Sequence, residues 1–120
     1  MKADSPMVWP QGLNRPPSDI EWTLLREGVE AAWLYRDPDG GPAAAYLRYQ
    51  PGAWVPLHYH PGEEHIFVLT GEQEDEYGRY PAGSLVFNAT GTRHSVLSRT
   101  GCLVLIIWSK QVEFMDSGER

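Results

Sequence analysis

Short apolar runs separated by glycine or proline make up most of the chain from residue 20 onward. Alternating apolar and polar positions, together with β-branched and aromatic residues, predict that these runs are strands. Beyond residue 42 the predicted strands cover residues 43–50, 53–60, 64–71, 84–88, 94–98 and 102–109. Turn residues divide them at a spacing near ten residues, which is typical of an all-β sandwich or barrel.

The segment before these strands, residues 21–34, is open to two interpretations, because a helix competes with a pair of strands. Gly28 in its middle and its β-branched and aromatic residues favour two strands, one on each side of a turn at residues 26–28. No segment beyond Ala31 has apolar residues at helical spacing over three turns. We therefore expect little helix.

The run at residues 103–108 is apolar at every position. A strand of this kind is covered on both faces, once by the core and once by another sheet layer or a subunit. A homodimer is therefore expected.

The chain has 120 residues, 12 of them Gly and 10 of them Pro, which suits one domain built from many short elements. Four prolines (Pro6, Pro10, Pro16 and Pro17) fall within residues 1–18. This stretch is predicted to be an extended arm because proline disfavours helix. Residues 19–120 are expected to form a single barrel domain.

Charge and cysteine content exclude several classes of partner. The net charge of −6 lacks the basic footprint that phosphate neutralisation needs, so nucleic acid is not expected as a partner. The lone Cys102 cannot form an intrachain disulfide, which favours a reducing compartment. No apolar run is long enough for a membrane span or a signal peptide, so a cytoplasmic protein without a membrane partner is expected.

All four histidines of the chain lie in one window of 37 residues. His58 and His60 are one residue apart in a predicted strand, so both imidazoles point to the same face and can share one ion. Glu64 follows a turn at residues 61–62, and His94 begins another predicted strand. The candidate metal ligands are therefore three imidazole nitrogens and one carboxylate oxygen, from His58, His60, Glu64 and His94.

Strand alternation excludes the neighbours of Glu64 from this set. Glu63 and His65 should point away if Glu64 points inward. The acidic residues 72–76 are expected at a solvated hairpin tip, and Cys102 is expected to be a small buried hydrophobe. Four aromatic residues are core candidates that could also line a pocket, namely Tyr46, Trp54, Tyr59 and Phe67.

The glycines around the candidate ligands reproduce a known pattern. The spacing Gly52-x5-His58-x-His60-x3-Glu64-x6-Gly71 matches the first motif of the cupin superfamily at every position. The second motif is resembled by Gly83-x7-Gly91-x2-His94, with Ala89 in place of the usual proline and Ser98 in place of a frequent asparagine. The resemblance spans residues 43–109. It implies a double-stranded β-helix, or jelly-roll, barrel with a metal on His58, His60, Glu64 and His94.

Residues 58–96 resemble more closely the cupin-like domain of ChrR-type zinc anti-sigma factors. The features in common are the paired Glu63-Glu64, the acidic stretch at residues 75–78 and the sequence YPAGS at residues 80–84. Metal-dependent dioxygenases that cleave carbon-carbon bonds of small ketones are similar as well. The 50 residues before the first motif lack Cys and His, so the sigma-binding zinc domain of that family has no counterpart there. This disfavours an anti-sigma role.

Imidazole and carboxylate donors suit a divalent Zn, Fe, Mn, Ni or Co ion without selecting one of them. Four protein ligands leave a position free for a substrate in five- or six-coordinate geometry, whereas a tetrahedral zinc would be closed. Two functions are therefore expected as alternatives. One is a small metalloenzyme of the dioxygenase type acting on a small organic substrate, and the other is a non-catalytic module that senses a metal or a ligand. No catalytic residue is assigned beyond the metal ligands.

Overall fold

Residues 6–115 are described in a computed structural model, where they form ten strands and no helix. The strands are β1 (Thr23–Arg26), β2 (Val29–Arg36), β3 (Ala43–Tyr49), β4 (Ala53–Tyr59), β5 (Glu64–Asp75), β6 (Gly78–Pro81), β7 (Leu85–Asn88), β8 (Arg93–Ser98), β9 (Cys102–Trp108) and β10 (Glu113–Phe114). The all-β prediction is confirmed, and residues 21–34 contain strands rather than the competing helix. Across these residues we find no helix with the length and apolar character needed to traverse a bilayer.

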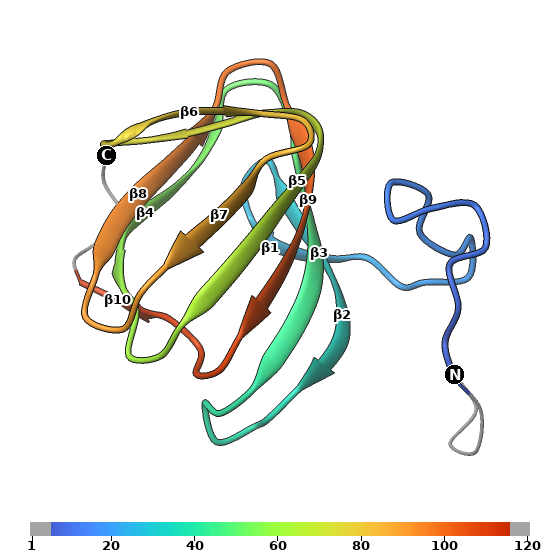
Figure 1. Ribbon diagram of the computed structural model, residues 1–120, viewed down its shortest axis with the longest axis horizontal. Coiled ribbons are helices and arrows are strands. Elements are labelled where there is room, and N and C mark those ends of the chain that lie inside the picture. Colours follow the sequence, from blue (N-terminus) through green and yellow to red (C-terminus); the bar gives the residue numbers. More distant parts are fainter. Residues whose placement is uncertain (1–5, 116–120) are drawn as a thin grey trace.

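The strands form a curled antiparallel sheet with two facing layers (Figure 1). One layer has the order β1-β2-β3-β9-β5, with β7 paired to the first residues of β5. The other layer contains β8, β4 and β10, together with β6 paired to the last residues of β5. Strand β5 therefore contributes to both layers and closes one side of the barrel.

The crossing of β5 from one layer to the other depends on Gly71. The register of β5 against β9 shifts between Val68 and Thr70, and Gly71 has a φ of 74°. A Cβ at Gly71 would overlap the carbonyl oxygen of Gly101, which lies in the turn between β8 and β9. The sequence predicted that this strand ends at Gly71, but here glycine bends the strand instead of terminating it.

The main core lies between the two layers. Inward-facing residues of β9 (Val104, Ile106 and Trp108) pack there against Ile66 and Val68 of β5. The alternate positions of β9 face outward, as the uninterrupted apolar run predicted. Hydrophobic residues therefore contact the inner face of β9 and, at Leu103 and Leu105, part of its outer face.

The outer face of β9 is covered in part by residues that precede β1. Trp9, Ile20 and Trp22 pack in a second cluster with Tyr46 and Leu105. The Tyr46 hydroxyl also donates a hydrogen bond to the carbonyl oxygen of Leu13, at 2.7 Å. The second cover expected for this strand thus comes from the chain's own N-terminal segment.

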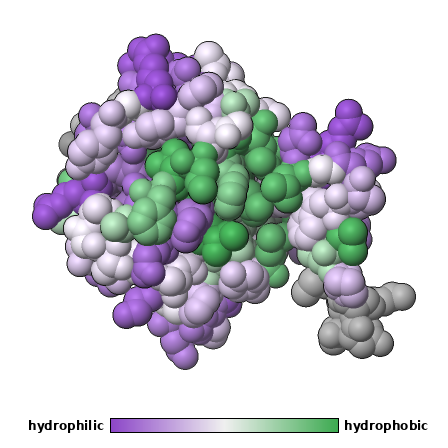
Figure 2. Space-filling view, in the orientation of Figure 1, coloured by the Kyte–Doolittle hydropathy of each residue, from purple (hydrophilic) through white to green (hydrophobic). Residues whose placement is uncertain are grey.

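Apolar residues beyond this cover remain at the surface. Leu85 and Phe87 on β7 are more than half exposed, and Ile107 on β9 is 37% exposed. Figure 2 shows hydrophobic residues gathered at the centre of the face that Figure 1 presents.

Replacing Gly71 by Ala should destabilise the fold more than the same change at Gly83. Both glycines have a positive φ, which costs a residue with a Cβ about 1–2 kcal/mol. Only at Gly71 would the new Cβ meet backbone atoms, and such overpacking adds about 1–3 kcal/mol. Urea unfolding of Gly71→Ala and Gly83→Ala measures the difference. Equal losses of stability in the two variants would show that no close contact exists at Gly71.

Candidate metal centre

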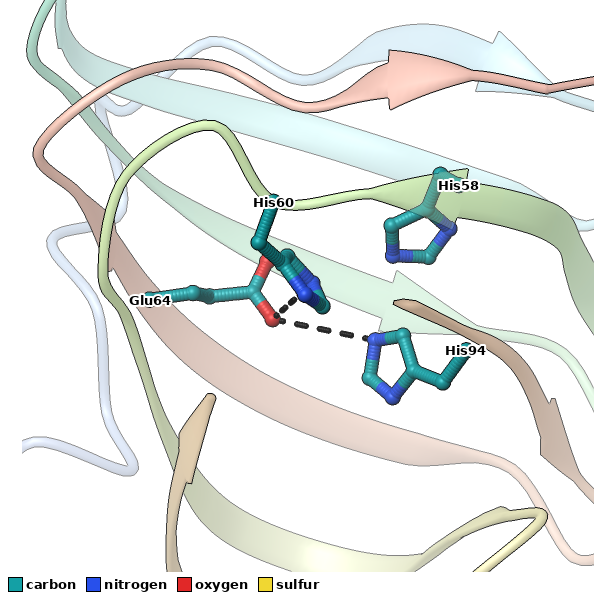
Figure 3. A group of neighbouring side chains, drawn as sticks. All are labelled: His58, His60, Glu64 and His94. Carbon is teal, nitrogen blue, oxygen red and sulfur yellow. Dashed lines mark ion pairs between the residues drawn. The ribbon is translucent and has the colours of Figure 1, made fainter. Parts of the chain in front are cut away.

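Four buried side chains converge in the barrel lumen from both layers (Figure 3). His58 lies on β4, His60 directly follows β4, Glu64 begins β5 and His94 lies on β8. Their exposed fractions are 4%, 1%, 2% and 2% in that order. One ligand atom from each can be chosen so that all four lie within 4.8 Å of one another. The structure therefore brings together the four residues that the sequence proposed as metal ligands.

A bulge in β4 turns His58 into the lumen. The register of β4 against β8 shifts between Val55 and His58, so these two residues both face inward although their spacing is odd. Pro56 lies within the bulge, where its missing N–H costs no ladder hydrogen bond. Beyond the bulge normal alternation returns, and His58 and His60 share the inner face as predicted.

Backbone hydrogen bonds fix His60 although it lies outside a strand. The His60 N–H donates to the Thr92 carbonyl oxygen, and the Gly91 N–H donates to the His60 carbonyl oxygen, each at 2.9 Å. These two bonds join the turn after β4 to the turn before β8. They hold His60 beside His94 without a regular strand.

Each histidine has an acceptor at Nδ1. His58 Nδ1 lies 2.8 Å from the Pro56 carbonyl oxygen, His60 Nδ1 lies 3.1 Å from the Thr92 carbonyl oxygen, and His94 Nδ1 lies 2.9 Å from Asp75 Oδ2. A carbonyl or carboxylate oxygen accepts only, so Nδ1 carries the proton in all three rings. The Nε2 atoms of the neutral rings are therefore unprotonated.

Glu64 accepts hydrogen bonds from its two flanking strands. Asn88 Nδ2 on β7 donates to Oε1 at 2.8 Å, and Trp108 Nε1 on β9 donates to Oε2 at 2.6 Å. Both donors lie opposite Glu64 in the strand register. Burial alone would raise the pKa of Glu64, but the facing histidines, His60 first, outweigh it when they carry a second proton, and the net pKa is lowered. Glu64 is thus an ionised and buried carboxylate.

The arrangement leaves lone pairs facing one another. His60 Nε2 lies 3.1 Å and His94 Nε2 lies 3.8 Å from Glu64 Oε1, yet His60 Nε2 makes no hydrogen bond. Burial, and next the positive charge that His94 carries when it is protonated, lower the pKa of His58 to about 4, so no proton is gained there at neutral pH. A cation between these atoms would remove the conflict, and the donor set suits a divalent transition metal.

The two neighbours of Glu64 lie outside the cluster. His65 occupies the outer face of β5, where its ring centroid is 5.0 Å from that of Phe87. Glu63 is exposed and accepts a hydrogen bond from the Thr90 hydroxyl. The prediction from strand alternation is therefore confirmed for both residues.

Asp75 was missed as a site residue because it belongs to the acidic stretch expected at a solvated hairpin tip. The hairpin exists, but the Asp75 side chain is only 2% exposed and holds His94 Nδ1. Asp75 Oδ1 also accepts hydrogen bonds from the Tyr80 hydroxyl at 2.6 Å and from the Tyr77 N–H at 2.8 Å. Burial opposes ionisation of Asp75, but these hydrogen bonds, Tyr80 first, lower its pKa.

A cavity of about 50 Å³ lies in the lumen beside the cluster. His58, Glu64 and His94 form part of its wall, and apolar residues form most of the remainder. The four aromatic candidates named from the sequence are not in this wall, and Tyr46 and Phe67 belong to the outer cluster. Cys102 is buried, as expected, and burial raises the pKa of its thiol to about 11.

Comparison with known proteins shows a family match over most of the chain. Residues 11–112 match the family described as ChrR Cupin-like domain. The anti-sigma-E factor ChrR of Cereibacter sphaeroides is 33% identical over 105 residues, which cover 85% of this chain and 48% of that protein. The dimethylsulfoniopropionate lyase DddQ of Ruegeria pomeroyi is 33% identical over 113 residues, covering 78% of this chain and 56% of that protein.

The chain thus spans about half the length of these curated relatives. The crystal structure of an acetylacetone dioxygenase from Acinetobacter johnsonii superimposes with a TM-score of 0.75, covering 99% of this chain and 88% of that one. Its sequence identity is 17%, so this likeness shows the fold alone.

The metal-free protein should lose stability as the pH falls from about 6.5 towards 4. The pKa of His58 is about 4 when folded, against 6.5 for an unperturbed histidine, so the unfolded chain binds more protons across this window. Once the pH is below both pKa values, this difference lowers the free energy of unfolding by about 3 kcal/mol. Urea unfolding at several pH values should show a shallower pH dependence for His58→Gln than for the wild type, whereas His65→Gln serves as the control. If stability depended on pH as steeply in His58→Gln as in the wild type, the lowered pKa of His58 would be contradicted.

Proposed function

The chain belongs to the ChrR cupin-like domain family, and from this premise we propose that it is a small metalloenzyme of the dioxygenase type acting on a small organic substrate. His58, His60, Glu64 and His94 would bind one divalent transition metal, with Zn, Fe, Mn and Ni as the candidates. The observation that carries the proposal is the convergence of three imidazole rings on the Glu64 carboxylate, each with its Nδ1 already beside an oxygen acceptor and its Nε2 left for a ligand role.

When bound, the ion would supply Lewis acidity or redox chemistry at a position that the four protein ligands leave open. The chain's own residues prepare that position. Asp75 orients the His94 ring, while Asn88 and Trp108 orient the Glu64 carboxylate. The apolar wall of the lumen lowers the local dielectric constant, which strengthens electrostatic interactions inside it.

A non-catalytic sensing module is the second candidate. It is supported by the small volume of the lumen cavity, about 50 Å³, and by the similarity to a protein named as an anti-sigma factor. In such a module the barrel would bind a metal or a small ligand without turnover. Binding without consumption of O₂ or ligand would favour this candidate.

We further propose a cytoplasmic homodimer that has no nucleic-acid partner. The exposed Leu85, Phe87 and Ile107 supply apolar surface for a second copy. The single buried thiol suits a reducing compartment, and the net charge of −6 disfavours binding to phosphate backbones.

Metal content should distinguish the proposed ligands from the remaining histidine. His60→Ala and His94→Ala each remove an imidazole donor and should reduce bound metal to a small fraction of the wild-type content. Asp75→Asn should weaken metal affinity by about 10–100-fold, as loss of an orienting partner does in other metal sites. Elemental analysis and chelator competition measure both effects.

His65→Ala is the matched control, because His65 lies on the outer face of β5. It should keep the wild-type metal content. Equal losses in all three alanine variants would overturn the ligand set.

Dioxygenase chemistry should appear as O₂ consumption by protein loaded anaerobically with Fe(II). A panel of small dicarbonyl and hydroxyketone substrates tests it with an oxygen electrode, and product analysis shows whether a carbon-carbon bond breaks. The His60→Ala protein, carried through the same loading, controls for free iron. Inertness of the loaded wild-type protein across metals and substrates would favour the sensing module.

A further inference from the structure

The lumen cavity has two polar regions in an otherwise apolar wall. One is the candidate metal cluster, and the other consists of Gln73 on β5 and Tyr49 on β3. The other lining residues are Leu25, Leu47, Val55, Ile66, Val96, Ile106, Trp108, Val112 and Phe114. A molecule in this cavity would therefore meet the cluster and the Gln73 side chain with only apolar surface between them.

Gln73 carries a free hydrogen-bond donor into this space. Its exposed fraction is 1%, and its Nε2 has no hydrogen-bond partner. Tyr49 is the polar neighbour of Gln73 in this part of the wall. Buried amide groups are rarely left unpaired, because each lost hydrogen bond costs stability. A bound ligand with an acceptor oxygen would satisfy this donor.

The wall also restricts the charge and size of the ligand. No Lys or Arg lines the cavity. Away from the metal cluster, the wall therefore offers no cationic side chain to an acidic group of a ligand. A volume of about 50 Å³ holds roughly three to five water-sized groups at roughly 10–15 Å³ each. The ligand is therefore uncharged and small, with up to about five non-hydrogen atoms.

We propose that Gln73 is the second anchoring residue of the lumen and selects small uncharged molecules that bear two oxygen functions. One oxygen would bind at the metal cluster, and the other would accept a hydrogen bond from Gln73 Nε2. Small hydroxyketones and dicarbonyls have this chemistry. The inference rests on the proposed metal site, although it requires only binding and no turnover.

Hydroxyacetone and butanone form a matched pair of probes for this proposal. They have the same number of non-hydrogen atoms, and they differ in that a hydroxyl replaces a methyl group. Zinc-loaded wild-type protein, which has no redox chemistry, should bind hydroxyacetone about three- to tenfold more tightly, as expected for one additional hydrogen bond. Equal affinities measured by NMR titration would overturn the proposal.

The side-chain amide signals of Gln73 provide a direct readout without any substitution. In ¹⁵N-labelled wild-type protein they should shift with hydroxyacetone and shift much less with butanone. No shift with hydroxyacetone, while the ligand binds, would place its second oxygen elsewhere and overturn the proposal.

Gln73→Met removes the amide at nearly constant volume, and Gln50→Met makes the same change at an exposed residue outside the lumen. Gln73→Met should lose the preference for hydroxyacetone and keep the wild-type affinity for butanone, whereas Gln50→Met should keep both affinities. Retention of the preference in a folded Gln73→Met protein would overturn the role of Gln73.

Zinc content, measured before each titration, separates this inference from the proposed function. A wild-type protein that retains no zinc contradicts the metal site itself. A protein that retains zinc but does not discriminate between the two probes contradicts only the role of Gln73.

Discussion

The buried Glu64 carboxylate is the constraint on which the rest of the barrel depends. An isolated charge in a dry interior is costly, so the fold must surround it with donors or a counter-ion. Strands β7 and β9 supply Asn88 and Trp108 as hydrogen-bond donors. The remaining side of the carboxylate faces imidazole nitrogens that, in the neutral rings, have no proton to donate. The fold therefore satisfies Glu64 on two sides and leaves the third to an ion.

Strand β5 serves this cluster at both of its ends. Glu64 is its first residue, and Asp75, its last, holds His94 from behind. The strand can reach the cluster twice only because it changes layers at Gly71. Gln73 faces the lumen between these two ends. The same backbone bend thus organises the candidate ligands, their support and the wall of the cavity.

Strand alternation and turn residues were enough to predict the all-β fold, the convergence of His58, His60, Glu64 and His94, and the outward position of His65. The same local rules could not find Asp75 or Gln73. Both lie beyond Gly71, where the strand was expected to end, and their inward orientation depends on a bulge and a layer crossing. The short strands β6 and β10 were also missed, because they contain few of the apolar residues on which strand prediction rests.

The positions of the candidate ligands in the two layers have a consequence for the motions of the barrel. His58 and His94 face each other on neighbouring strands of one layer, while Glu64 begins its strand in the other. An ion held by all three would fasten the layers together across the lumen. Its release would leave each ladder of backbone hydrogen bonds intact but would let the layers separate more often. Hydrogen exchange would then quicken for inward-facing amides of both layers together.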